Sequence, residues 1–98
     1  MKENKMINIL NYLEETIDKK KHNNVNPSYT KNLLEGDLNK VIQKVGEESV
    51  ELLIEATLKN KKRTIYESAD LIYHLLVMWS RLDITLDEIA KELENRKK

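Results

Sequence analysis

Two short acidic motifs in the sequence consist of residue types that could bind a metal ion. Glu48 and Glu51 form an E-x-x-E pair, and Glu67 and Asp70 form an E-x-x-D pair. Residues three apart lie on one face of an α-helix, so each pair would line one edge of its helix. If the two helices pack antiparallel with these edges facing, four carboxylates converge, which is unfavourable unless a cation or protons neutralise them.

A site made only of carboxylates restricts both the metal and the reaction. Oxygen ligands favour Mg²⁺ or Mn²⁺ over zinc. Mg²⁺ usually keeps part of its water shell and is bound together with substrate phosphates. The chemistry indicated is therefore cleavage of a phosphate ester or a phosphoanhydride.

Several residues in and around these motifs also have ordinary structural interpretations. Glu67 together with Thr64 matches a T-x-x-E capping box, in which the glutamate satisfies the start of a helix. Glu47, and Glu55 one turn beyond the E-x-x-E pair, fit surface or auxiliary positions. His74 lies in an apolar run, where a histidine is more often a hydrogen-bonded packing residue than a functional one.

Basic residues accompany the acids in the sequence. Lys44 lies one turn before Glu48 and could pair with that acid or hold a phosphate. Four more basic residues follow the first acidic segment: Lys59, Lys61, Lys62 and Arg63. Such a run usually forms a solvated loop that complements a helix C-terminus, and it could also attract polyphosphate toward the acids.

The composition predicts one soluble domain over residues 1–98 and excludes several classes of site. Of the 98 residues, 40% are apolar and 35% are charged, which suits a single packed core. The absence of cysteine excludes disulfides, thiolate zinc sites and thiol catalysis. Two glycines and one proline cannot supply a glycine-rich nucleotide loop.

The charge balance argues against partners that bind through bulk electrostatics. Seventeen basic and seventeen acidic residues give no net attraction to nucleic acid or to an anionic membrane. Apolar stretches are too short for a bilayer span, and the N-terminal residues are too polar for a signal peptide. We therefore expect a cytoplasmic protein.

The acids need helices to position them, and the apolar periodicity is helical almost throughout. A helix that begins after Asp37, a good N-cap residue, and runs to about Lys59 would carry the E-x-x-E pair. The Thr64 capping box would open a second helix that carries the E-x-x-D pair and runs to about Leu82. The short connection predicts that these two long central helices are antiparallel neighbours.

Two further helices are expected before the central pair. The first spans about residues 4–20 and should turn an apolar stripe inward, formed by Met6, Ile9, Leu10, Leu13 and Ile17. A short second helix should begin at Ser28, which follows Pro27, and end at Gly36. We interpret this short helix as a lid or brace.

A final helix completes the expected fold. Thr85 and Glu88 form another capping box, which would open a helix toward Arg96. No segment shows the alternation of a half-buried strand. The predicted fold class is therefore all-α, a bundle of four to five helices with two long antiparallel helices at its centre.

The motif residues also resemble a known family. The acids read EExxE from Glu47 to Glu51 and ExxD from Glu67 to Asp70, as in the all-α, MazG-like NTP pyrophosphohydrolases. The strings KVGEE and DLIYHL resemble, within that group, phosphoribosyl-ATP pyrophosphohydrolase of histidine biosynthesis. The resemblance covers nearly the whole chain, including the strings SYTKNLLEGDLNKVIQ and LDEIAKEL.

The resemblance implies a reaction and a metal. The expected activity is hydrolysis of phosphoribosyl-ATP to phosphoribosyl-AMP and pyrophosphate, the second step of histidine biosynthesis. It also implies that four acids bind Mg²⁺, with Mn²⁺ as a possible substitute: Glu48, Glu51, Glu67 and Asp70. In this context the E-x-x-D pair outweighs the capping interpretation of Glu67.

Catalytic and substrate-binding roles are expected for residues beside this set. Glu47 is a candidate for orienting or deprotonating the attacking water, although one of the ligands could do so instead. Lys44 and Arg63 would supply positive charge to the phosphates, with Lys44 also counted as catalytic. His74 is a candidate substrate-binding residue.

Two other interpretations remain open from the sequence. One keeps the enzyme class but changes the substrate to another nucleoside triphosphate, such as dUTP or dCTP, as in house-cleaning enzymes. The other is a non-enzymatic helical module whose acidic edges are simply solvated. In either case Val50 and Ile54 lie off the main apolar stripe of their helix, and we expect them to support a homodimer that forms a larger bundle.

Overall fold

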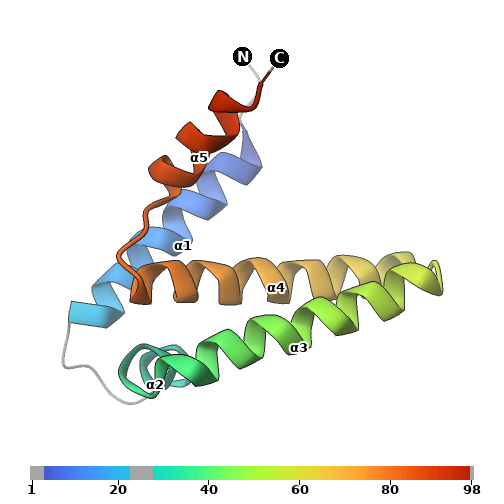
Figure 1. Cartoon of the computed structure of the whole chain (residues 1–98), viewed down its shortest axis with the longest axis horizontal. Coiled ribbons are helices and arrows are strands. Elements are labelled where there is room, and N and C mark those ends of the chain that lie inside the picture. The colour runs from blue at the N-terminus through green and yellow to red at the C-terminus, as the bar shows by residue number, and fades with distance from the viewer. Residues whose placement is uncertain (1–3, 23–27, 98) are drawn as a thin grey trace.

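The computed structural model describes residues 4–22 and 28–97. These residues form five helices and no strand, so the all-α prediction is confirmed. None of these helices combines the length and the apolar character that a membrane span requires. The helices are α1 (Lys5–His22), α2 (Tyr29–Glu35), α3 (Leu38–Thr57), α4 (Lys61–Arg81) and α5 (Leu86–Asn95) (Figure 1).

The two long helices form an antiparallel hairpin, as expected, and this hairpin carries both acidic motifs. α3 and α4 lie side by side, α2 packs at the end of the hairpin away from the turn, and α1 and α5 form an arm at an angle to it (Figure 1). The amide of Leu86 donates to the carboxylate of Glu14 over 2.7 Å, which ties the start of α5 to α1. In this arrangement the turn between α3 and α4 projects beyond the other three helices (Figure 1).

The buried core lies where α1, α2, α3 and α4 meet. Its buried apolar members are Ile17, Leu34, Val41, Leu76 and Val77. Leu10 and Leu13 of α1 also pack against this core, which confirms the C-terminal half of the predicted stripe. The prediction is wrong for Met6 and Ile9, which are exposed because the N-terminal half of α1 extends beyond the hairpin.

Most helix starts follow from local capping residues. Ser28 caps α2 and Asp37 caps α3, each with its side chain accepting a backbone N–H, and Gly36 follows the end of α2. Thr85 and Glu88 form the complete capping box predicted for α5. The neighbouring Pro27 lies outside the described residues.

The predicted start of α4 is wrong. Asn60, rather than Thr64, is the N-cap, because its side chain accepts the backbone N–H of Arg63 over 3.1 Å. Lys59 has a positive φ of 57°, which ends α3 in a tight turn. Lys61, Lys62 and Arg63 therefore form the first turn of α4 instead of a solvated loop. Glu67 is free of any capping role and lies in the second turn.

Candidate functional site

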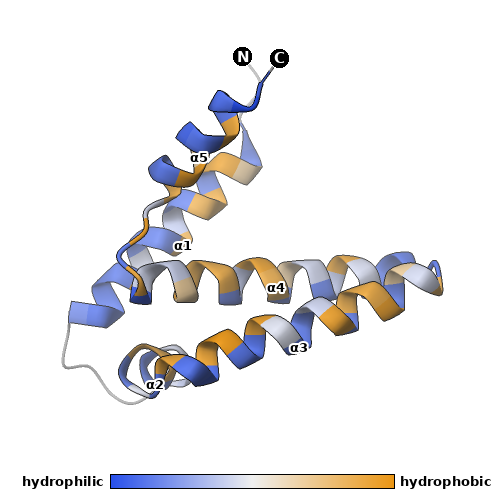
Figure 2. Cartoon of the chain, in the orientation of Figure 1, coloured by the Kyte–Doolittle hydropathy of each residue, from blue (hydrophilic) through white to orange (hydrophobic). Residues whose placement is uncertain are grey.

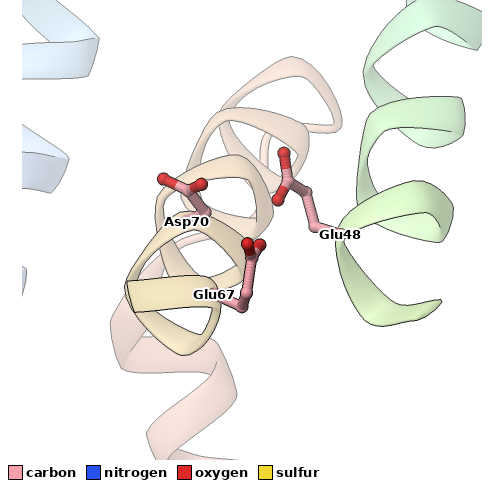
Figure 3. A group of neighbouring side chains, drawn as sticks. All are labelled: Glu48, Glu67 and Asp70. Atoms are coloured by element: carbon pink, nitrogen blue, oxygen red, sulfur yellow. The ribbon is translucent and has the colours of Figure 1, made fainter. Parts of the chain in front are cut away.

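Three acids from the two motifs meet between the long helices. Glu48 of α3 and Glu67 and Asp70 of α4 each offer one carboxylate oxygen, and these oxygens lie within 4.8 Å of one another (Figure 3). Glu48 is 6% exposed and Glu67 4% exposed, whereas Asp70 is half-buried. The three form what we call the acid cluster, in which the half-buried Asp70 carboxylate is the one nearest to solvent.

Two oxygens in the acid cluster lack hydrogen bonds. Oε2 of Glu48 and Oε2 of Glu67 are buried and accept no hydrogen bond from the described residues. A buried carboxylate oxygen without a donor is costly unless a cation or a proton satisfies it. An all-oxygen set of this kind fits a hard divalent cation such as Mg²⁺.

The pKa of Glu67 reflects this environment. Burial raises it above the ordinary glutamate value, and repulsion from the carboxylate of Glu51 raises it further. Arg63 acts in the opposite direction, and Glu48 adds to the increase. The net upward direction shows that the fold disfavours the charged form of this side chain.

Glu51, the fourth acid expected to bind the metal, lies at the edge of the cluster. It is exposed, and it is not among the three acids whose oxygens lie within 4.8 Å. It nevertheless lies near enough to Glu67, on the neighbouring helix, to raise the pKa of that carboxyl. The sequence motif thus brings three acids together and places the fourth beside them.

Each buried glutamate has a basic residue one helical turn before it. Arg63 donates from Nη2 to Oε1 of Glu67 over 2.8 Å, and its guanidinium lies 4.6 Å from the centre of the Tyr66 ring. Lys44 Nζ lies 3.9 Å from Oε1 of Glu48. Both basic side chains are partly exposed, so each can reach solvent as well as the acid.

His74 is both a packing residue and a neighbour of the acid cluster. Its ring is buried, and Nδ1 lies 2.8 Å from the backbone oxygen of Asp70 and 3.8 Å from Oε1 of Glu48. The hydroxyl of Tyr29 lies 2.6 Å from Nε2 on the opposite side of the ring. Sequence reasoning did not find Tyr29, because its partner lies 45 residues away and no periodicity connects them.

Glu47 and Glu55, the other two acids considered from the sequence, differ in their exposure to solvent. Glu47 is exposed on α3 and accepts a hydrogen bond from the Gln43 amide over 3.0 Å, outside the acid cluster. Glu55 was expected at the surface, but it is half-buried and its Oε2 is buried without a partner among the described residues. The surface interpretation therefore holds for Glu47 and is wrong for Glu55.

The chain is similar to known proteins over most of its length. The sequence profile of the family PRA-PH, phosphoribosyl-ATP pyrophosphohydrolase, matches residues 10–97. The phosphoribosyl-ATP pyrophosphatase of Methanococcoides burtonii is 40% identical over 93 residues, which cover 93% of this chain and 94% of that protein. That of Methanosarcina barkeri is 44% identical over 92 residues, covering 92% of this chain and 88% of that protein.

A longer relative contains the same region as one part. The histidine biosynthesis bifunctional protein HisIE of Bacteroides thetaiotaomicron is 45% identical over 87 residues, which cover 89% of this chain but 43% of that protein. The chain thus spans less than half the length of this bifunctional relative. With a profile match over almost its whole length and relatives covered nearly end to end, the chain belongs to the phosphoribosyl-ATP pyrophosphohydrolase family.

Proposed function

We propose that this chain hydrolyses phosphoribosyl-ATP to phosphoribosyl-AMP and pyrophosphate, the second step of histidine biosynthesis. The names of its relatives and of its family support this substrate. The observation that carries the proposal is the acid cluster, which combines three carboxylates within 4.8 Å with two buried oxygens that lack donors. A solvated acidic edge, as in a non-enzymatic helical module, would not bury such oxygens.

Mg²⁺ is the cation that we propose for the acid cluster, with Mn²⁺ as a substitute. Glu48, Glu67 and Asp70 would hold it, and Glu51 would complete the set from its exposed edge. When bound, the cation neutralises charge on phosphate oxygens and lowers the pKa of water. Without it, the fold must keep carboxylates together against their repulsion.

The basic residues are proposed to hold the phosphates. Arg63 and Lys44 neutralise Glu67 and Glu48 in this structure, and both side chains extend to solvent. Once a bound cation neutralises the acids, the side chains of Arg63 and Lys44 can turn to phosphate oxygens of the substrate. The Arg63 guanidinium can bind such oxygens in a bidentate manner. His74 is also proposed to contact substrate. Because its ring is buried and both nitrogens have partners, this contact would be made through the ring edge beside Glu48.

Glu47 is the proposed residue for orienting the attacking water. Its carboxylate is solvated and accepts one hydrogen bond from Gln43, so it must leave that amide to reach a water at the cluster. The reaction needs no protein nucleophile, since water attacks the α phosphorus in line and pyrophosphate leaves.

The decisive experiment compares substrates and metal conditions. Pyrophosphate release is measured from phosphoribosyl-ATP, dUTP and dCTP, each with Mg²⁺ and with EDTA. We expect release from phosphoribosyl-ATP with Mg²⁺ and its loss with EDTA. Faster release from either deoxynucleotide would reassign the substrate, and turnover unaffected by EDTA would refute the metal centre.

A homodimer in the cytoplasm is the proposed state of the protein. Near the hairpin turn, apolar side chains of both long helices are exposed: Val50, Leu53, Ile54, Leu58, Ile65 and Tyr66. Figure 2 shows apolar stretches continuing along α3 toward this turn, beyond the buried core. An exposed apolar surface of this kind is typical of an interface between subunits. The absence of cysteine suits a reducing compartment.

A further inference from the structure

The short helix α2 contacts α4 through two adjacent hydroxyl groups. The Tyr29 hydroxyl bonds to Nε2 of His74 over 2.6 Å, and the Thr30 hydroxyl bonds to the Tyr73 hydroxyl. Both aromatic rings beside His74 meet it edge to face, at 5.8 Å for Tyr29 and 5.7 Å for Tyr73. The first of these hydrogen bonds reaches a ring nitrogen of His74, whereas the second reaches Tyr73, which touches His74 through its ring alone.

The contacts of His74 determine which ring nitrogen carries a hydrogen. A backbone carbonyl only accepts, so Nδ1, 2.8 Å from the oxygen of Asp70, must donate. In the neutral ring Nε2 then has only a lone pair, and the Tyr29 hydroxyl donates to it. Burial raises the pKa of Tyr29, and Lys44 opposes this increase in part, so the hydroxyl keeps its hydrogen at neutral pH.

The same ring faces a proposed metal ligand. Nδ1 of His74 lies 3.8 Å from Oε1 of Glu48, and the other oxygen of Glu48 has no donor among the described residues. Among the described residues, the cationic side chain that pairs with Glu48 is Lys44, whose Nζ lies 3.9 Å from Oε1. The carboxylate of Glu48 is thus held by long contacts, one of them to the His74 ring.

We propose that Tyr29 is a positioning residue of the acid cluster, which acts through His74 on Glu48. This proposal rests on the proposed metal-binding function. The Asp70 carbonyl fixes the tautomer of the imidazole and the Tyr29 hydroxyl fixes its rotation. The imidazole in turn keeps the Glu48 carboxylate aimed between α3 and α4. Hydrogen bonds one shell beyond a metal ligand orient that ligand in the same way in metalloproteins generally.

The test compares Tyr29→Phe with Thr30→Val and Tyr12→Phe. Tyr29→Phe removes one hydroxyl and keeps the ring, whereas Thr30→Val breaks the neighbouring contact between α2 and α4. Tyr12→Phe makes the same chemical change on an exposed part of α1. Each protein is titrated with Mn²⁺ alone, and free Mn²⁺ is followed by electron paramagnetic resonance.

We expect Tyr29→Phe to weaken Mn²⁺ binding by about tenfold. Thr30→Val should lower the melting temperature but leave Mn²⁺ affinity within twofold of wild type, which is about the error of such a titration. Tyr12→Phe should change neither quantity. Unchanged affinity in Tyr29→Phe, or equal losses in Tyr29→Phe and Thr30→Val, would overturn the proposal and leave α2 as a structural brace.

A second measurement reports on the ring itself. The protein has two histidines, so a His22→Gln variant assigns the side-chain nitrogen signals of His74 in a long-range ¹H–¹⁵N correlation spectrum. Tyr29→Phe should move the Nε2 signal toward that of a pyridine-type nitrogen without a donor. An unmoved signal would also overturn the proposal, whereas wild-type protein that binds no Mn²⁺ would refute the metal centre together with it.

Discussion

Glu48 and Glu67 are both buried carboxylates, but different groups neutralise them. Glu67 receives a 2.8 Å hydrogen bond from Arg63, whereas the basic groups near Glu48 are both almost 4 Å away. Even with this bond, the Glu67 pKa is raised, so burial and repulsion outweigh the ion pair. At the scale of single residues, the fold therefore disfavours the charged carboxylates of the acid cluster, and a bound cation would neutralise them.

The raised pKa of Glu67 predicts the effect of removing its charge. A carboxyl whose pKa is higher in the fold than in the unfolded chain destabilises the fold as pH rises through the folded pKa. Glu67→Gln should therefore raise the melting temperature of the metal-free protein at neutral pH. Calorimetry with EDTA checks this expectation, and a lower melting temperature would show that the Arg63 pair dominates instead.

Mg²⁺ should stabilise the wild-type protein and have little effect on Glu67→Gln. A ligand that binds only the native state contributes about 2.7 kcal/mol at a hundred times its dissociation constant. Melting curves over a range of Mg²⁺ concentrations measure this response. Equal insensitivity of both proteins would remove the support for a metal centre.

Among the acids of the cluster, Asp70 is the one whose replacement should disturb the fold least while still lowering turnover. Asp70→Asn keeps the size and the helix position, and Asp70 is half-buried rather than buried. We expect Mg²⁺-dependent pyrophosphate release to fall by about a hundredfold, or roughly 2.7 kcal/mol of transition-state stabilisation.

The matched control for this change is Asp18→Asn, because Asp18 is an exposed acid on α1 outside the acid cluster. Its turnover should equal that of wild type. Full activity in Asp70→Asn would contradict the ligand assignment, and equal losses in both variants would indicate a general effect of acidic charge.

At the scale of elements, local signals predicted four of the five helix starts well and failed at one. Asp37 and Thr85 cap their helices as expected, because each cap needs only residues within three positions. Thr64 matched the same pattern, but Asn60 offered a cap one turn earlier, and lysine and arginine are good helix formers. A basic run can therefore look like a loop and still be the first turn of a helix.

Contacts between distant elements could not be predicted in this way. The acid spacing indicated three members of the acid cluster, since periodicity determines which residues share a helix face. It could not indicate that Tyr29 reaches His74, or that Arg81 donates to the Leu33 carbonyl over 2.6 Å, 48 residues away. Such contacts depend on how the helices pack, which the sequence of one helix does not contain.

The Asn60 cap gives a prediction at this scale. Asn60→Ala should lower the free energy of unfolding by about 1 kcal/mol, because the N–H of Arg63 loses its acceptor. Thr64→Ala, at the position first expected to be the cap, should cost less, since the Thr64 hydroxyl donates to the Asn60 carbonyl one turn before it and caps no backbone N–H of the described residues. Urea denaturation of both variants compares them, and the reverse order would restore the Thr64 capping box.

At the scale of the whole molecule, the core and the acid cluster occupy different parts of the hairpin. The buried residues gather where α1 and α2 meet α3 and α4, whereas the apolar side chains toward the hairpin turn are uncovered. The grooves found between α1, α4 and α5 contain no member of the acid cluster. A single chain therefore covers one end of its central helices and leaves the other end, beyond the acids, uncovered. This uncovered end is the surface on which we propose that a second chain packs.

The uncovered end of the hairpin supplies the last prediction, which concerns assembly. Leu53 is 65% exposed on α3 and Ile65 is 61% exposed on α4, and burying such side chains is worth roughly 1.5–3 kcal/mol each. We expect a dimer at micromolar concentration, measured by size-exclusion chromatography with light scattering. Leu53→Glu should convert it to a monomer, because a glutamate in the interface would be buried without a partner. Lys19→Glu, on an exposed face of α1, should leave the dimer intact. A wild-type monomer, or a dimer unaffected by Leu53→Glu, would mean that this surface does not join two chains.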